Sequence, residues 1–419
     1  MSLVAPRSSD VGRAELQSQG AKLAVLVAAL GYFVDAYDLI LFSIVRTTSL
    51  RSLGLSEDQI LRQGVLLLNM QMAGLLIGGI VWGVLGDKRG RLSVLFGSIA
   101  LYSLANIANG VVSSVSQYAV LRFVAGVGLA GELGAGVTLV TEIMPPRTRG
   151  YGTTIIAAVG MLGVIAASLV GDAYDWRTAY FIGGGMGLAL LVLRAGVAES
   201  GMFEGVRRAR VARGDFWSLI ASPKTRVKYL RVVLIGTPVW YVSGILFTFA
   251  PEFGRAMDMP TLPAAGQAVL YSAIGLAIGG ISSGTLSQII KRRNRVVGIF
   301  LTLVSIFVAA YFAIAHVSLV VFYTICLLLG IAQGYWAVFM TIASEQFGTN
   351  IRATVTTTAP NFVRGTVIIM TSVFQLLRPT LGLRGSAILV GAVTLGIAYL
   401  SLSGLDETYG KDLDYVEVA

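Results

Sequence analysis

The sequence predicts an all-α membrane protein with twelve transmembrane helices arranged as two pseudo-symmetric six-helix bundles. Hydrophobic residues make up 55% of the 419 residues and charged residues only 13%, which excludes a water-soluble core of ordinary composition. The apolar residues form continuous runs of helix length, and about 20 such residues cross a hydrocarbon layer about 30 Å thick. A transmembrane barrel would instead show shorter segments of alternating polarity.

An internal repeat predicts the two bundles. The segment Gly78-Gly79-Ile80-x-x-Gly83-x-Leu85 matches Gly279-Gly280-Ile281-x-x-Gly284-x-Leu286, and a basic loop follows each copy. The spacing of Glu142 from Arg149 is likewise the same as that of Glu345 from Arg352. Both pairs fall at the end of the fourth helix of their half, so two independent matches support one duplication. Secondary transporters are commonly built from such repeats, with the binding site between them.

The apolar runs give the order of the elements. The first set of expected spans covers residues 22–45, 61–85, 92–112, 117–141, 150–170 and 178–195. The second set covers residues 229–250, 265–289, 296–315, 318–341, 353–376 and 385–403. These sets define an N-terminal bundle over 22–195 and a C-terminal bundle over 229–403. The segments expected outside the bundles are an N-terminal tail over 1–21, a polar and basic linker over 196–228 and a C-terminal tail over 404–419.

The distribution of lysine and arginine predicts the orientation. Loops rich in these residues remain cytoplasmic, and with the N-terminus inside, most basic side chains fall on the cytoplasmic side. Both termini and the linker are therefore expected to be cytoplasmic, in a multi-pass protein of the plasma membrane or bacterial inner membrane. The formal charge of +10 does not require a nucleic-acid partner, because anionic lipid headgroups attract such basic loops. We therefore expect no nucleic-acid partner.

The loop between the second and third spans carries a family resemblance. Its sequence is Gly83-Val84-Leu85-Gly86-Asp87-Lys88-Arg89-Gly90-Arg91, which resembles the G-x-L-x-D-x-x-G-R signature of the major facilitator superfamily. The resemblance covers essentially the whole chain and implies that this loop latches the cytoplasmic side. The second copy departs from the signature, with Gln288 and Lys291 at the positions of its acid and glycine. The residues expected to control this gate are Gly83, Asp87, Arg91, Glu142, Arg149, Glu345 and Arg352.

Segments of the first and fourth spans resemble one branch of the superfamily. These are Gly31-Tyr32-Phe33-Val34-Asp35-Ala36-Tyr37-Asp38-Leu39 and Arg122-Phe123-Val124-Ala125-Gly126-Val127-Gly128-Leu129-Ala130-Gly131-Glu132. They are similar to the phosphate:proton and metabolite:proton symporters, and sialic-acid and organic-ion carriers share versions of them. The resemblance implies a proton-coupled carrier without identifying its substrate.

Three carboxyl groups lie within the predicted spans. Asp35 lies near the middle of the first span, Asp38 follows on the same helical face, and Glu132 lies near the middle of the fourth span. Ionised carboxylates are costly inside a membrane and usually mark a functional site. A group there that gains and loses a proton can couple transport to a proton gradient. The alternative for each is a structural ion pair between helices.

Two arginines also lie within spans. Arg364 has Asn361 one turn before it and no acid in its own span, so it needs either an acid from another helix or an anionic ligand. The resemblance to organic-anion carriers favours the ligand. Arg122 is expected to pair with Asp38 or to contact the substrate.

Aromatic residues cluster at the same depth, where rings with a polar edge can line a cavity. The candidates are Trp240 and Tyr241 in the seventh span and Tyr335 and Trp336 in the tenth, with Gln333 beside them. Packing between helices is the alternative for each ring.

The sequence shows no catalytic constellation, so we expect that the protein is not an enzyme. It contains one cysteine, Cys326, which excludes an internal disulfide and a cysteine-based metal site. No phosphate-cradling motif of the Walker type occurs, which argues against an ATP-driven pump. No cofactor and no metal are expected, since a proton gradient would supply the driving force.

These observations predict a monomeric carrier in the lipid bilayer that transports a small anionic organic metabolite together with protons, by alternating access. Three alternatives remain open. A uniporter or exchanger of the same fold would use the buried acids only for structure. A carrier of organic cations would use Asp35 or Asp38 to attract its substrate. A sensor would bind ligand without transport.

Overall fold

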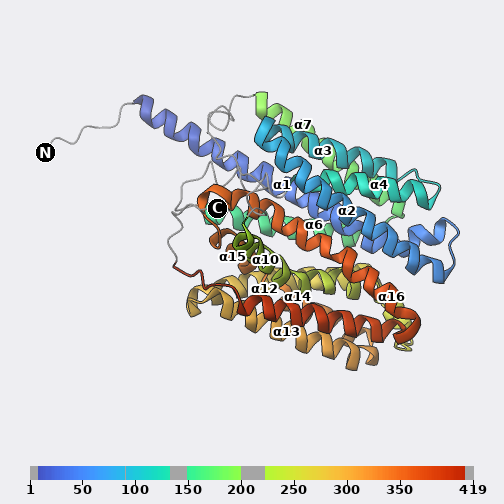
Figure 1. Ribbon diagram of the computed structural model, residues 1–419. Coiled ribbons are helices and arrows are strands. Elements are labelled where there is room, and N and C mark those ends of the chain that lie inside the picture. Colours follow the sequence, from blue (N-terminus) through green and yellow to red (C-terminus); the bar gives the residue numbers. More distant parts are fainter. Residues whose placement is uncertain (1–7, 90, 133–148, 200–221, 411–419) are drawn as a thin grey trace.

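The computed structural model describes residues 8–89, 91–132, 149–199 and 222–410. Long helices run roughly parallel along the molecule (Figure 1). The helices of the first half are α1 (Ser8–Ser52), α2 (Glu57–Arg89), α3 (Arg91–Asn109), α4 (Val115–Leu129), α6 (Arg149–Ala173) and α7 (Trp176–Glu199). Those of the second half are α10 (Pro223–Tyr241), η1 (Val242–Phe247), α11 (Ala250–Ala256), α12 (Ala265–Ile290), α13 (Arg293–Ile314), η2 (Ala315–Val317), α14 (Leu319–Gln333), α15 (Trp336–Glu345) and α16 (Thr349–Ser403).

Within these residues, eight helices are long and apolar enough to cross a membrane, and three shorter apolar helices accompany them. The helix α16 consists of two of the expected spans, which are joined by a kink at Gly382, where φ is 66° and ψ is −178°. Only glycine adopts this backbone conformation without steric penalty. Counting α16 twice gives the twelve spans expected from the sequence.

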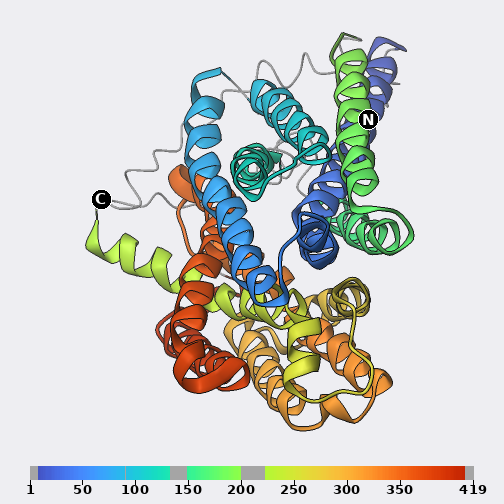
Figure 2. The ribbon, with the colours of Figure 1, turned by 90° about the vertical axis from the view of Figure 1, so that its right-hand side faces the viewer.

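The two halves form separate bundles, which Figure 2 shows as blue-to-green and yellow-to-red groups of helices. The internal packing of the bundles is equivalent, since α1 packs on α6 and α2 on α4, as α10 packs on α16 and α12 on α14. The bundles meet where α2 contacts α16 and α6 contacts α12. The interface therefore has the pseudo-symmetry that the repeat predicts.

The repeated glycines explain part of this symmetry. A Cβ atom on Gly78 would collide with the backbone of Val127 in α4, and one on Gly279 would collide with the backbone of Ile331 in α14. Glycines at matching positions thus let the backbones of two equivalent helix pairs approach closely. Larger residues at either position would separate these helices.

We define the terminal end of the molecule as the end at which α1 begins and α16 finishes (Figure 1). The opposite end carries the α1–α2 turn and the reversal of α16. Two boundaries differ from expectation at the terminal end. The helix α1 begins at Ser8, within the expected tail, and α10 begins at Pro223, within the expected linker. Hydrophobicity alone missed both extensions, because a helix can continue beyond the apolar layer with polar residues.

Candidate functional site

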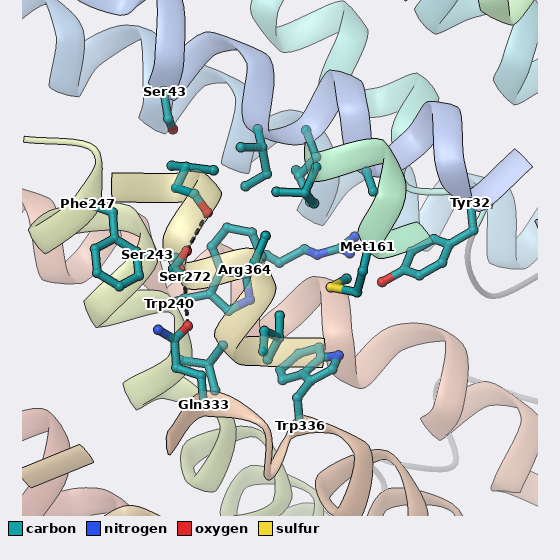
Figure 3. Close-up of a pocket in the computed structure, with 18 residues that line it drawn as sticks. Tyr32, Ser43, Met161, Trp240, Ser243, Phe247, Ser272, Gln333, Trp336 and Arg364 are labelled. Carbon is teal, nitrogen blue, oxygen red and sulfur yellow. Dashed lines mark hydrogen bonds between the residues drawn. The ribbon is translucent and has the colours of Figure 1, made fainter. Parts of the chain in front are cut away.

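A cavity of about 100 Å³ lies at the interface of the two bundles (Figure 3). The first bundle contributes Tyr32, Ala36, Leu39, Ile40, Ser43, Met161 and Val164. The second contributes Val239, Trp240, Ser243, Phe247, Val269, Ser272, Ala273, Leu276, Gln333, Trp336 and Arg364. Its walls are mostly apolar with few polar groups, as is usual for small-molecule sites.

Helical spacing explains which residues of α1 face the cavity. Tyr32, Ala36, Ile40 and Ser43 follow one another at intervals of three or four residues, so they share one face of the helix. Asp35 lies on the flank of this face. The helix therefore presents a small polar and apolar surface to the cavity and keeps its carboxyl group beside it.

Arg364 is the cationic group of the cavity. It is only 3% exposed, and its Nη1 donates to Asn361 Oδ1 at 3.3 Å. Its guanidinium also lies over the Trp240 ring, 5.7 Å from the ring centroid, a distance at which cation–π attraction acts. Within the described residues, no carboxylate lies within 4.0 Å of this guanidinium.

Asn361 positions Arg364 rather than lining the cavity. Its Nδ2 donates to the Ala130 carbonyl at the end of α4, at 3.2 Å, and to the Thr357 carbonyl at 3.3 Å. The first contact crosses between the bundles. The predicted binding role of Asn361 is therefore an indirect one in this structure, exerted through its hydrogen bond to Arg364.

The four candidate aromatic residues separate into two kinds. Trp240 and Trp336 line the cavity. Tyr241 is buried and donates to the Ala387 carbonyl at 2.8 Å, while Tyr335 is buried and donates to the Ile235 carbonyl at 2.9 Å. Successive helical residues point in directions about 100° apart, so only one member of each pair reaches the cavity. In this structure both tyrosines thus pack between helices, which is the alternative to the predicted substrate contact.

Gln333 provides a polar group on the cavity wall. Its Oε1 accepts a hydrogen bond from Ser243 at 2.9 Å, shown as a dashed line in Figure 3. Its Nε2 has no hydrogen-bond partner among the described residues. This amide is therefore an available donor at the cavity.

Asp35 is a buried carboxyl group without a fixed partner. It is fully buried, and neither carboxylate oxygen has a hydrogen-bond partner within the described part of the chain. Arg364, Glu132 and Asp38 are charged groups that interact with it electrostatically. Buried polar groups are normally hydrogen-bonded, so this carboxyl group, which has no partner among the described residues and lies beside the cavity, is a candidate site for proton exchange.

Asp38 and Arg122 lie together inside the first bundle, away from the cavity wall. Both are fully buried to within 1%, and Asn106 lies beside Asp38. The Arg122 guanidinium stacks over the rings of Phe42 and Tyr180, at 5.1 and 5.8 Å from their centroids. Asp38 forms no well-aligned hydrogen bond with either neighbour. The predicted substrate contact of Arg122 is therefore not made from this position.

Glu132 forms a buried ion pair with Arg194 of α7. Both guanidinium Nη atoms donate to the two carboxylate oxygens, and Nη2 also donates to the Val27 carbonyl at 3.2 Å. Gly31 of α1 packs directly against this pair, where a Cβ atom would collide with both partners. Arg194 thus supplies the partner for the structural ion pair that is the alternative for Glu132, and the proton-carrying role of Glu132 remains a prediction.

The variant Glu132→Gln is expected to destabilise the protein by about 3–5 kcal/mol, because it leaves the buried Arg194 charge uncompensated. Thermal unfolding of the purified protein measures this loss. Glu57→Gln is the control, since Glu57 pairs with Arg51 and Arg255 through side chains that are 43–56% exposed, and exposed pairs contribute about 1 kcal/mol or less. If Glu132→Gln has unchanged stability but has lost proton coupling, the proton-carrying role of Glu132 is favoured over the structural one.

The predicted gate residues are only partly described. Glu142 lies outside the described residues, and the structure describes no side chain for Asp87, Arg91, Arg149 or Arg352. The expected loop is mostly helical, since α2 continues to Arg89 and α3 begins at Arg91. Among the residues whose side chains the structure describes, none lies within 4 Å of the Cβ position of Gly83.

Glu345 has partners that the repeat did not predict. Its oxygens accept from Arg293 at 3.3 Å and from Thr408 at 2.7 Å. These contacts tie the end of α15 to the start of α13 and to the segment after α16. The predicted gating role of Glu345 and Arg352 remains a prediction.

Sequence reasoning missed several residues that matter at the site. Tyr32, Ser43, Ser243 and Ser272 line the cavity, and helical spacing from the flagged residues was the signal that could have found them. Arg194 is an arginine within an apolar span, and its charge was the corresponding signal. Among the described residues, no group of three or more His, Cys, Asp or Glu side chains could hold a metal ion.

Comparison with known proteins places the chain among transporters. The family model described as Major Facilitator Superfamily matches residues 28–371. The niacin transporter NiaP of Acinetobacter baylyi is 25% identical over 78% of this chain and 80% of its own length. The 3-(3-hydroxy-phenyl)propionate transporter of Escherichia coli is 26% identical over 79% of each chain. The fold also resembles the crystal structure of a D-xylose-proton symporter, with a TM-score of 0.69, 16% identity and coverage of 93% and 99%.

Proposed function

The chain belongs to the major facilitator superfamily, and on this premise we propose that it is a proton-coupled symporter of a small organic anion. The family consists of transporters, so the chain is a multi-pass membrane carrier and not an enzyme. Aromatic or unsaturated carboxylates are the substrate class that best fits the cavity.

The observation that carries this proposal is Arg364. A buried guanidinium without a carboxylate partner is costly inside a membrane, and a substrate carboxylate would offset that cost. Asn361 and Trp240 hold the guanidinium at the cavity wall. A planar guanidinium group that is held in one orientation can donate two parallel hydrogen bonds to a planar carboxylate.

The remaining cavity surface supports a flat, partly apolar substrate body. The rings of Trp240 and Trp336 offer stacking surfaces, and Gln333 and Ser272 offer polar contacts. The niacin and hydroxyphenylpropionate carriers are named for aromatic carboxylic acids. Both names are consistent with a carboxylate at Arg364 and a ring against the tryptophans.

We assign the proton step to Asp35, because it is a buried carboxyl group near Arg364 and has no hydrogen-bond partner among the described residues. Protonation would remove a negative charge that competes with the substrate for Arg364. Substrate and proton would then favour each other's binding, which is the thermodynamic requirement for symport. Asp38, beside Arg122, is the second candidate for the same proton.

The arrangement of two bundles around a central cavity supports transport by alternating access. The distribution of basic residues favours cytoplasmic termini in the plasma membrane or bacterial inner membrane. The terminal end would then be the cytoplasmic side. No second protein chain is needed to complete the cavity, because both bundles of one chain supply its walls.

Ligand-induced thermal stabilisation tests the proposal directly. Nicotinate and 3-(3-hydroxyphenyl)propionate are expected to raise the melting temperature of the purified protein, because a ligand at 100 times its Kd stabilises the folded state by about 2.7 kcal/mol. Nicotinamide, which lacks the carboxylate, is the matched control and should have little effect. Equal stabilisation by the amide would contradict an anion site at Arg364.

Transport by reconstituted vesicles separates the mechanisms. A symporter accumulates the stabilising ligand when a pH gradient is imposed, with the acidic side as the source. A uniporter or exchanger would equilibrate or exchange the ligand without accumulating it. Binding without flux under either condition would indicate a sensor.

A further inference from the structure

A second ion pair joins the two bundles near the opposite end of the molecule. Arg46 lies in the last part of α1, and Glu252 lies in the first turn of α11. Arg46 Nη2 donates to both Glu252 oxygens, at 2.7 and 2.8 Å, and to the Thr248 carbonyl at 3.1 Å. One side chain of the first bundle therefore binds two groups of the second.

This contact is shielded from solvent. The side chains of Arg46 and Glu252 are 0% and 9% exposed, and the guanidinium lies 4.6 Å from the centroid of the Phe249 ring. Water cannot readily replace either partner there, so separating the bundles at this end requires breaking a desolvated charge pair.

Two further polar contacts between the bundles at the same end are exposed. Arg255 pairs with Glu57 at 2.9 Å through half-exposed side chains, and Gln267 donates to Asp172 at 2.6 Å at the surface. Exposed contacts are readily exchanged for water and contribute little. The buried Arg46–Glu252 pair is thus the dominant electrostatic link at this end among the described residues.

A chain of hydrogen bonds connects this pair to the cavity. The Thr248 hydroxyl lies 3.0 Å from the hydroxyl of Ser43 and 2.9 Å from the carbonyl of Ser243. Ser43 and Ser243 both line the cavity, and Ser243 donates to Gln333. Thr248 therefore contacts the cavity wall through its hydroxyl and Arg46 through its carbonyl.

The backbone between these groups is irregular. Pro238 lies inside α10, the helix continues as the π-helical segment η1, and α11 begins only after Thr248 and Phe249. π-Helical segments are rare and occur frequently at functional sites. Glu252 is thus carried on a short helix that is separated from α10 by two departures from α-helical geometry.

We propose that Arg46 and Glu252 form the latch that closes the opposite end, and that Thr248 links this latch to the occupied cavity. The inference rests on the proposed transport function, for which the latch must open once in each cycle. A ligand that draws Ser243 or Gln333 toward itself would shift Thr248 and with it the Arg46 contact. The η1 segment and the start of α11 are the parts of the chain that can accommodate this shift.

Cysteine labelling tests the latch without any substrate. In a Cys326→Ser background, Ser272→Cys places one thiol in the cavity wall, and a membrane-impermeant maleimide reports access from one side of vesicles. A separate Ser56→Cys marker in the exposed α1–α2 turn identifies vesicles whose opposite end faces the reagent. Glu252→Gln is expected to raise the rate of Ser272→Cys labelling from that side by about tenfold or more, as a shift of the open population.

Glu57→Gln is the matched control, because it neutralises a glutamate that also links the bundles at this end but is exposed. We expect it to change the labelling rate by less than about twofold. Equal effects of the two variants, or no increase with Glu252→Gln, would overturn the latch. If Glu252→Gln does not fold, the doubly neutral Arg46→Gln/Glu252→Gln variant decides, since it leaves no uncompensated charge and should also raise labelling.

A disulfide tests the link through Thr248. The Ser43→Cys/Thr248→Cys pair replaces two hydroxyls that lie 3.0 Å apart, so oxidation should join the bundles at this point. Added to Glu252→Gln, the oxidised pair is expected to return labelling to the unmutated rate, and a reductant should restore the increase. Labelling that stays high after oxidation would contradict this link. Because neither assay needs substrate or a gradient, failure of the latch is distinguishable from failure of the transport proposal.

Discussion

Arg364→Ala is expected to weaken the binding of a carboxylate ligand strongly while the protein remains folded. A bidentate contact between a guanidinium and a carboxylate is among the strong polar contacts in proteins. Truncation of one partner of a buried charged contact costs about 2–5 kcal/mol, and every 1.4 kcal/mol is about tenfold in affinity. The expected loss of affinity is therefore between about thirtyfold and several thousandfold.

The structure explains why folding should survive this substitution. The Arg364 guanidinium has one long hydrogen bond, to Asn361, and within the described residues it has no carboxylate partner that would be left buried and unpaired. Removing it also removes the desolvation penalty of an unpaired cation. Glu132→Gln is expected to have the opposite effect on stability, because it leaves the buried charge of Arg194 without its partner.

Isothermal titration with the ligand that most strongly raises the melting temperature measures the effect. Arg364→Lys is the matched variant, because it keeps the charge and loses the planar fork, and it should bind with intermediate affinity. Affinity for the carboxylate within twofold of the unmutated protein in Arg364→Ala would remove the anion site from the proposal.

The fold was predictable because the membrane constrains the backbone so strongly. A spanning helix must satisfy every backbone polar group internally and must be about 20 apolar residues long. Hydropathy therefore located each span on a helix of the structure, although the end of the fourth expected span lies outside the described residues. The repeated glycines predicted the symmetry, and Gly78 and Gly279 indeed occupy equivalent helix contacts. The helical extension to Ser8 was missed, because polar helix outside the membrane leaves no hydropathy signal.

The candidate site was only partly predictable, for a different reason. An ionisable residue inside a span is costly wherever it lies, so the sequence alone drew attention to Asp35, Glu132 and Arg364. Their partners come from other helices, and the sequence does not give the rotation of one helix against another. Glu132 therefore pairs with Arg194, which lies 62 residues later in the sequence. Arg364 has no carboxylate within ion-pair distance among the described residues.

The ion pair between Arg46 and Glu252 could not be predicted, because both residues lie at the edges of the expected spans. Arg46 and Glu252 each lie just beyond the apolar run that defines their span, where charged residues normally face water and need no explanation. Only the packing of α1 against the segment that follows η1 buries them together. A charge at the edge of a span thus has no definite environment until the helix contacts are known.

Asp35→Asn is expected to abolish accumulation driven by a pH gradient while exchange of substrate across the membrane continues. Asparagine keeps the volume and polarity of the side chain and cannot take up or release a proton at this position. Since the Asp35 carboxylate has no hydrogen-bond partner within the described residues, the substitution breaks no contact there, and folding should be retained. Gradient-driven uptake is expected to fall by about a hundredfold or more. About a hundredfold is the lower limit of the effects that a proton-transferring side chain usually has on a rate.

Vesicles loaded with unlabelled ligand test exchange, and empty vesicles under an imposed pH gradient test accumulation. Asp58→Asn is the control, since its exposed carboxyl group at the start of α2 can lose its charge without entering the transport path. Asp38→Asn separates the second candidate from the first, because Asp38 lies beside Arg122 rather than near Arg364. If Asp35→Asn still accumulates substrate and Asp38→Asn does not, the proton step belongs to the Asp38–Arg122 site. If both variants accumulate substrate, the buried carboxyl groups of α1 serve structure, and coupling must be sought elsewhere in the bundles.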